Sequence, residues 1–286
     1  MDLSGVGVWS NQLRYGDAGE AADAAAELEE LGFSALWIPD IGGPLFDSID
    51  NLLTSTKQAV IATGILNLWM HEPSDVATRY ASLTKTHGER FLLGIGVSHA
   101  PLIDTREPGL YRKPLAATRA FLDAIDATDT PVPVQNRVLA ALGPKMLELS
   151  ATRARGAHPY LVTPDHTRTA REVLGDGPLL LPEQAVFLTD SRDEARAVGV
   201  NFLRTYTGLP NYANNLLRSG FSQDDLDSVS DRLLDAIIAW GDEDAVARRV
   251  EEHKQAGADH VCVQALTAEP LAFPREQWRR LAAALV

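Results

Sequence analysis

Short apolar runs, rich in β-branched and aromatic residues, alternate along the chain with longer stretches of helical period. This alternation constrains the fold most strongly, because it is typical of βαβ units and of the parallel sheet that they build. Pro159 weakens one strand candidate, since proline cannot donate a ladder hydrogen bond. Eight strands joined by helices predict an α/β fold, a closed (β/α)8 TIM barrel, whereas a doubly wound sheet usually has about five or six strands. The eight strand candidates are residues 5–9, 35–40, 59–66, 91–97, 137–141, 157–162, 185–188 and 260–264.

The length of 286 residues suits one barrel, and no Ser-, Gly- or Pro-rich linker divides the chain, so we expect a single domain over residues 1–286. The regular spacing breaks once, at residues 206–231, where extra residues mix Gly, Asn and aromatic side chains. We expect an insertion at the barrel mouth, near the C-terminal third, that is either a lid or an extra pair of surface helices. Helices are expected at residues 20–31, 74–87, 115–127 and 145–153.

The composition excludes several classes of function. Acidic residues outnumber Lys and Arg by 39 to 26, and a net charge of −13 argues against a nucleic-acid partner. The single cysteine, Cys262, rules out an internal disulfide framework and suits a reducing cytoplasm. No secretory leader and no apolar run of about 18 residues occurs, so we expect a soluble cytoplasmic protein without a membrane partner. The seven histidines show no metal-binding spacing, and we expect no metal.

Polar residues and glycines close several of the strand candidates, at the end where a barrel enzyme carries its chemistry. Asp40 can hydrogen-bond a cofactor or orient a proton donor, or it can cap a turn. Gly64 indicates a bulge, a close backbone approach or simple packing. Gly94 and Gly96 form a GxG, but His99 stands where a dinucleotide fingerprint needs its third glycine, so a Rossmann site is disfavoured. His99 suits acid–base work, although a lone histidine is often a structural donor.

A helix predicted to begin at Pro144 would leave free N–H groups that favour phosphate. Lys145 can add a positive charge there, or it can be a solvated surface lysine. No GxxxxGK[ST] loop and no GxSxG elbow occurs, which leaves nucleotide hydrolysis and serine-esterase chemistry without support.

Four segments together resemble the luciferase-like superfamily, and most closely its subgroup of oxidoreductases that use the deazaflavin coenzyme F420. The most specific segment has a Pro-opened helix, the turn Gly88-Glu89-Arg90-Phe91, which is one residue longer than usual, and then Leu-Gly-Ile-Gly. The subgroup is favoured by the strings GILNLW, AALGPKM and GAHPYLVTP. The four segments cover nearly the whole chain, at residues 27–40, 72–99, 140–164 and 243–266.

The resemblance implies a cofactor ring at the strand ends and a non-prolyl cis peptide within residues 64–67. Asp40 matches an acidic position that faces the cofactor, and His99 stands where some relatives have a catalytic acid, often a carboxylate. His99 is therefore our first candidate for the acid or base, and Asp40 the second. The cofactor-binding residues implied are Asp40, Gly64, Ile65, Leu66, Asn67, Gly96, Val97, Ser98, Ala141, Leu142, Gly143 and Lys145.

The expected activity is hydride transfer between C5 of the F420 deazaflavin and a small organic substrate. Two alternatives stay open: an FMN-dependent luciferase-like monooxygenase, and a flavin-binding barrel without turnover. The aromatic residues Trp9 and Trp69 and the insertion can line an apolar substrate pocket, or they can belong to the core. The resemblance favours a homodimer.

Overall fold

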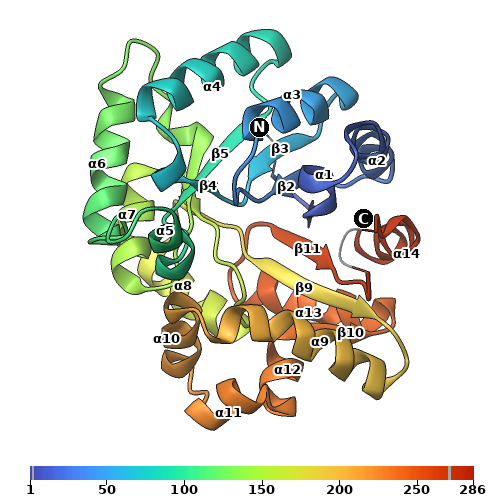
Figure 1. The fold of residues 1–286 in the computed structure, drawn as a ribbon. Helices are drawn as coiled ribbons and strands as arrows, with labels where there is room; N and C mark the ends of the chain where they lie inside the picture. The colour runs from blue at the N-terminus through green and yellow to red at the C-terminus, as the bar shows by residue number, and fades with distance from the viewer. Residues whose placement is uncertain (2, 270–271) are drawn as a thin grey trace.

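The computed structural model describes residues 1, 3–269 and 272–286. Its strands form one parallel sheet in the order β10-β9-β11-β1-β2-β3-β5-β6-β7-β8, with β4 beside β5 (Figure 1). The sheet closes into a ring at β9, because β8 continues into β9 with only residues 181–182 between them. The N–H groups of Leu181 and Glu183 donate to the carbonyls of Ala157 and Pro159, each at 2.9 Å. With β8 and β9 counted as one bent strand, the ring is the predicted α/β barrel. The strands are β1 (Val6–Trp9), β2 (Ala35–Ile38), β3 (Val60–Thr63), β4 (Leu66–Asn67), β5 (Phe91–Gly96), β6 (Arg137–Leu139), β7 (Gly156–Ala157), β8 (Leu179–Leu180), β9 (Glu183–Leu188), β10 (Ile238–Gly241) and β11 (Val261–Ala265).

The predicted strand at residues 157–162 is wrong beyond Ala157. β7 ends there, and the backbone turns at Leu161, which has a left-handed φ of 59°. Two strands were not predicted. β8 has only two residues, and β10 directly follows helix α12, so no polar break separates its apolar run from the helical period.

The helices surround the barrel, and the four predicted ones form within two residues of their expected bounds (Figure 1). Local capping sets several starts: the Asp17 carboxylate accepts from two backbone N–H groups, and proline opens α4, α6, α7, α8 and α10. The helices are α1 (Gln12–Tyr15), α2 (Ala18–Glu30), α3 (Leu45–Ser55), α4 (Pro73–His87), α5 (Ala100–Arg106), α6 (Pro114–Asp126), α7 (Pro144–Arg153), α8 (Pro164–Leu174), α9 (Arg192–Thr207), α10 (Pro210–Arg218), α11 (Gln223–Ser228), α12 (Asp231–Ile237), α13 (Glu243–Gln255) and α14 (Arg275–Leu285), with 3-10 turns at Leu68–Met70 and Val134–Asn136.

Residues 206–231 hold the end of α9, all of α10 and α11, and the first residue of α12. Helix α10 packs against α9, and its Asn211 amide donates to the carbonyl of Ser98 at the end of β5. The insertion is therefore a pair of helices that also contacts the C-terminal edge of the barrel.

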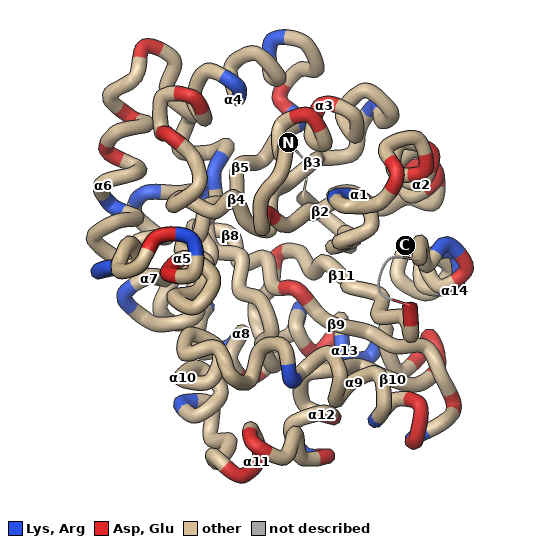
Figure 2. Tube along the Cα trace, viewed as in Figure 1, with Lys and Arg blue, Asp and Glu red and all other residues tan. Residues whose placement is uncertain are grey.

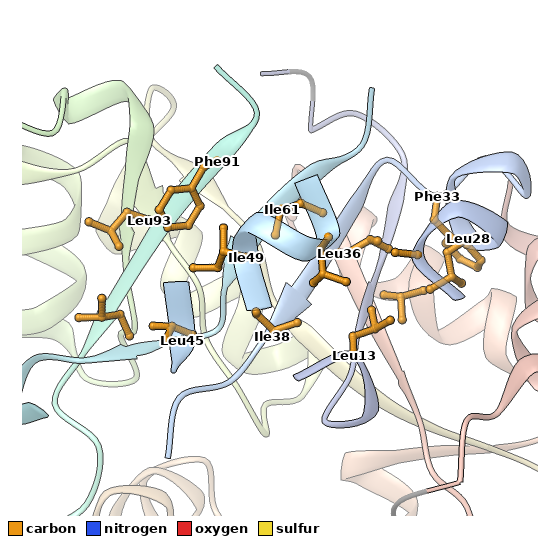
Figure 3. Packing of buried hydrophobic residues seen from close by; sticks show 14 of the residues in the cluster. Leu13, Leu28, Phe33, Leu36, Ile38, Leu45, Ile49, Ile61, Phe91 and Leu93 are labelled. Carbon is orange, nitrogen blue, oxygen red and sulfur yellow. The ribbon is translucent and has the colours of Figure 1, made fainter. Parts of the chain in front are cut away.

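Two apolar layers explain why the strands read as continuous hydrophobic runs. Successive side chains alternate, so Leu36, Ile61 and Leu93 point outward and pack with the helices, as Figure 3 shows. Trp37 belongs to a second cluster inside the barrel, where it stacks on His158 with ring centroids 4.3 Å apart. Lys, Arg, Asp and Glu residues lie mainly in the surrounding helices and loops (Figure 2). In the described part of the chain, no helix is both long and apolar enough to cross a membrane.

Candidate functional site

Asp40 anchors the end of β2 to the segment that follows β3. Its carboxylate accepts hydrogen bonds from the backbone N–H groups of Gly42 and Asn67, each at 3.1 Å, and contacts Nε2 of His71 at 2.7 Å. The side chain has no exposed surface. Burial raises the pKa of Asp40, but the bonds from His71, Asn67 and Gly42 outweigh it and hold the pKa below its usual value. Asp40 is therefore an ionised acceptor whose oxygens are engaged.

The segment after β3 contains the non-prolyl cis peptide that the resemblance implied, between Gly64 and Ile65. Gly64 lies against the barrel interior, where its carbonyl accepts from Nε1 of Trp9 at 3.1 Å. A Cβ at Gly64 would lie 2.6 Å from that nitrogen and 2.9 Å from Nε2 of His158, so packing requires glycine. Leu66 and Asn67 are fully buried.

The end of β5 lies directly beside this segment, because Asn67 pairs with Gly96. A Cβ at Gly96 would lie 2.6 Å from Cγ1 of Ile65 and 3.0 Å from Cβ of Ala140, so this glycine lets three strand ends meet. The carbonyl of Val97 accepts from Nε1 of Trp69 at 2.8 Å. Ser98 has a left-handed φ of 52° and turns the chain into α5.

His99 directly precedes α5 and lies against helix α10 of the insertion at residues 206–231. Its ring centroid is 4.8 Å from that of Tyr212 on α10. Burial lowers the pKa of His99 to about 4, so the imidazole is neutral at pH 7. Its Nδ1 is buried without a hydrogen-bond partner among the described residues. A neutral imidazole with an unused nitrogen can accept or donate one hydrogen bond to a ligand.

Tyrosines from three elements gather above the barrel interior. The Tyr160 hydroxyl donates to Oε1 of Gln264 at 2.7 Å and lies 2.9 Å from the Tyr206 hydroxyl. Because Tyr160 has only one proton to give, Tyr206 donates to it. Tyr212 packs against both rings, at 5.9 Å and 5.2 Å, and Trp9 lies 5.2 Å from Tyr160. Aromatic rings of α9 and α10 therefore meet the strand ends.

Below these rings, Glu183 is a buried carboxyl group, 1% exposed. Burial raises its pKa to about 8, although the N–H of Leu161 donates to Oε2 at 3.2 Å and opposes the shift. Its Oε1 has no hydrogen-bond partner among the described residues. The protonated carboxyl group therefore predominates in the folded protein at neutral pH.

The loop after β6 forms the helix terminus that the sequence predicted. Gly143 precedes α7, and none of the described side chains caps the helix there. The carbonyl of Leu142 accepts from Nε2 of His166 at 2.9 Å, and the Arg218 guanidinium lies 3.6 Å from where a Cβ of Gly143 would be. Ala141 is buried and Lys145 is exposed.

The structure thus brings Asp40, residues 64–67 and residues 96–98 into direct contact, and Gly96 connects them to the β6 loop. Sequence reasoning missed five residues of this region, which come from elements far apart in the chain: His71, Tyr160, Glu183, Tyr212 and Arg218. Only the aromatic content of residues 206–231 gave a signal for Tyr212. In residues 1, 3–269 and 272–286, no three His, Cys, Asp or Glu side chains are placed to share a metal ion.

The sequence profile of the family described as luciferase-like monooxygenase matches residues 2–260. The chain belongs to the luciferase-like monooxygenase family. The resemblance inferred from the sequence is thereby confirmed at the level of the family. The cis peptide between Gly64 and Ile65 lies in the segment where that resemblance placed it.

Relatives of this luciferase-like chain include proteins named for different cofactors. One relative is a protein of Mycobacterium tuberculosis (strain ATCC 25618 / H37Rv) that is assigned as a coenzyme F420-dependent oxidoreductase. The two sequences are 22% identical in an alignment 316 residues long, which covers 87% of this chain and 91% of the relative. An F420-dependent secondary alcohol dehydrogenase, solved with an F420–acetone adduct, superposes with a TM-score of 0.75 at 16% identity, covering 99% of this chain and 98% of the other. A third relative is a type II Baeyer–Villiger monooxygenase solved with FMN, the oxygenating constituent of 3,6-diketocamphane monooxygenase from the CAM plasmid of Pseudomonas putida. It superposes with a TM-score of 0.71 at 16% identity, covering 98% of this chain and 96% of the other. These structural likenesses show the fold and do not choose between the cofactors.

Proposed function

We propose that this chain is an F420-dependent oxidoreductase that transfers a hydride between C5 of the deazaflavin and a small organic substrate. The observation that carries the proposal is the neutral, desolvated imidazole of His99 at the end of β5, with Nδ1 unpartnered among the described residues. Such a group at the C-terminal edge of a barrel is placed for acid–base work. The F420-dependent relative supports the choice of cofactor.

The residues at the strand ends fit a planar heterocycle. Asn67 is fully buried, and its amide nitrogen Nδ2 has no partner in the described chain. That donor suits a ring carbonyl, and the backbone beside Gly64 and Gly96 suits the ring face. Leu142, Gly143 and Lys145, at the start of α7, would hold the phosphate. Bound F420 would supply or accept the hydride.

The proton chemistry is assigned to His99. When a hydride leaves the carbon of an alcohol, the hydroxyl proton must also leave, and the neutral imidazole can accept it at Nδ1. In the reverse direction the same nitrogen returns the proton to a carbonyl oxygen. Asp40, whose oxygens are engaged, acts as a positioning residue that fixes Asn67.

Fluorescence titration of the purified protein with F420 and, separately, with FMN tests the cofactor. Tighter binding of F420 supports the proposal. Preference for FMN would instead favour the monooxygenase, a function also supported by the FMN-bound structure with the same fold. Binding of neither cofactor refutes both functions, and binding without substrate-dependent turnover would indicate a non-catalytic flavin-binding barrel.

The variant His99→Asn tests the catalytic role. We expect hydride transfer, measured by the absorbance of F420 with a substrate found by screening, to fall by about 10²–10⁴-fold, which is the usual contribution of a positioned acid or base. The dissociation constant for F420 should change little. His87→Asn at the surface end of α4 is the matched control. An unchanged rate in His99→Asn would remove this residue from the chemistry.

A further inference from the structure

Tyr212, in the first turn of α10, lies against the imidazole of His99. The two ring centroids are 4.8 Å apart, and the ring planes are inclined by 41°. Two further rings contact Tyr212: Tyr206 of α9 meets it edge-on at 5.2 Å, and Tyr160 lies 5.9 Å away. Packing against these rings fixes the place of the Tyr212 ring beside the imidazole.

Asn211, the residue before Tyr212, joins α10 to the loop that carries His99. Its Nδ2 donates to the carbonyl of Ser98 at 2.9 Å and to the Tyr111 hydroxyl at 3.1 Å. Ser98 has a left-handed φ of 52° and directly precedes His99, so this bond acts on the backbone that orients the imidazole. Helices α5 and α10 lie on the same side of the barrel (Figure 1).

The titratable groups around His99 leave its imidazole in an uncharged setting. On α5, the Asp104 carboxylate accepts from two backbone N–H groups of the following turn, each at 3.1 Å, and Arg106 donates to a carbonyl of the loop after β2 at 3.1 Å. The lowered pKa of His99 comes from burial. Burial also raises the pKa of each phenol in this region, so that all of them are neutral at pH 7: Tyr111, Tyr160, Tyr206 and Tyr212.

We propose that Tyr212 is a positioning residue for proton transfer, because its ring covers the imidazole of His99 against water and so keeps the unpartnered Nδ1 for the substrate. The inference rests on the proposed function for the chemical role of His99. The Tyr212 hydroxyl has no hydrogen bond to any of the described residues. The ring, and not the hydroxyl, therefore provides the cover, and phenylalanine should provide it equally well.

NMR titration of the His99 ring in the protein without cofactor tests the cover directly. The signal of His99 is the one that is lost in His99→Asn. The ring should still be neutral at pH 5 in the unmodified protein and in Tyr212→Phe. In Tyr212→Ala the midpoint should rise from about pH 4 to between about pH 5 and 6, toward the ordinary value of 6.5. Leu217→Ala, on the same helix at a side chain that is 39% exposed, is the matched control and should leave the midpoint unchanged.

The pH profile of turnover separates a role in proton transfer from a purely structural one. A protonated imidazole cannot accept the proton of an alcohol, so the rate falls as the pH falls through the pKa of His99. In Tyr212→Ala the rate at pH 5, relative to the rate at pH 7, should be about two- to tenfold lower than in the unmodified protein. Glu183, with a pKa of about 8, stays mainly protonated across this range and adds little charge.

Asn211→Ala gives a second reading that does not depend on the folding of Tyr212→Ala, because it leaves every ring in place and removes the bond to Ser98. Its midpoint should also rise, by less than in Tyr212→Ala. A His99 ring that stays neutral at pH 5 in both variants overturns the inference and leaves the proposed function standing. A midpoint that rises equally in Tyr212→Phe overturns the assignment to the ring. Raised midpoints in a protein that shows no turnover overturn the proposed function, and with it the chemical role of His99, while the cover over its ring stands.

Discussion

The buried carboxyl group of Glu183 should make the stability of this protein depend on pH in a defined direction. Its pKa is raised from an ordinary value of 4.5 to about 8 in the folded protein. The folded chain therefore keeps a proton on Glu183 that the unfolded chain releases above about pH 4.5. Between these two pKa values the unfolded state binds fewer protons, so this group makes unfolding easier as the pH rises. Above about pH 8 the effect levels off.

The variant Glu183→Gln mimics the protonated carboxyl group, because its Oε1 can still accept from the N–H of Leu161. Each pH unit in the window changes the contribution of Glu183 by at most about 1.4 kcal/mol. From pH 6 to pH 7.5 the free energy of unfolding of Glu183→Gln, relative to the unmodified protein, should rise by about 2 kcal/mol.

Urea unfolding at these two pH values, followed by tryptophan fluorescence, measures the difference. Glu251→Gln on the exposed face of α13 is the control, and its relative stability should not depend on pH in this way. Stability curves for Glu183→Gln and the unmodified protein that stay parallel from pH 6 to pH 7.5 would refute the raised pKa.

Two further variants test the packing of the site. Gly96→Ala places a Cβ 2.6 Å from Cγ1 of Ile65, and should cost about 1–3 kcal/mol of stability and weaken cofactor binding, whereas Gly177→Ala, where a Cβ meets nothing within 4 Å, should change urea unfolding by less than about 0.5 kcal/mol. Asp40→Asn replaces an acceptor oxygen by a donor facing buried N–H groups, and should cost about 1–3 kcal/mol at pH 7. Because the folded pKa of Asp40 is lowered, its contribution is fully present at pH 7 and is lost only as the pH falls through the folded pKa. A neutral result at Gly96 or Asp40 in the same unfolding assay would contradict the packing argument.

Several features of the site were visible in the sequence because they are local. Pro144 opens α7 where its position predicted, since a proline at the first helical turn loses no hydrogen bond. The cis peptide at Gly64 and Ile65 followed from the family resemblance. The placement of Asp40, Gly96 and His99 at or just after strand ends followed from where the apolar runs end. Their catalytic and binding roles stay predictions, as do the homodimer and the cytoplasmic location.

Other features depended on contacts between distant residues, which no local pattern encodes. The engagement of the Asp40 carboxylate requires His71, 31 positions away, and the hydroxyl chain from Tyr160 requires Gln264, 104 positions away. The pKa values of His99 and Glu183 are shifted chiefly by burial, a property of the folded surroundings. Pro159 also shows the limit of local reading. The chain leaves the sheet there, yet the N–H of Glu183 still donates to the Pro159 carbonyl and helps to close the barrel.

The sequence by itself determined the alternation of strands and helices, and hence the barrel, because side-chain period and capping act over a few residues. Tertiary structure alone decided which polar groups lose water and which find partners. It buried Glu183, left Nδ1 of His99 without a partner among the described residues and brought Tyr212 of the insertion against His99. Those outcomes depend on the packing of elements far apart in the chain, and it is they that give the residues their chemistry.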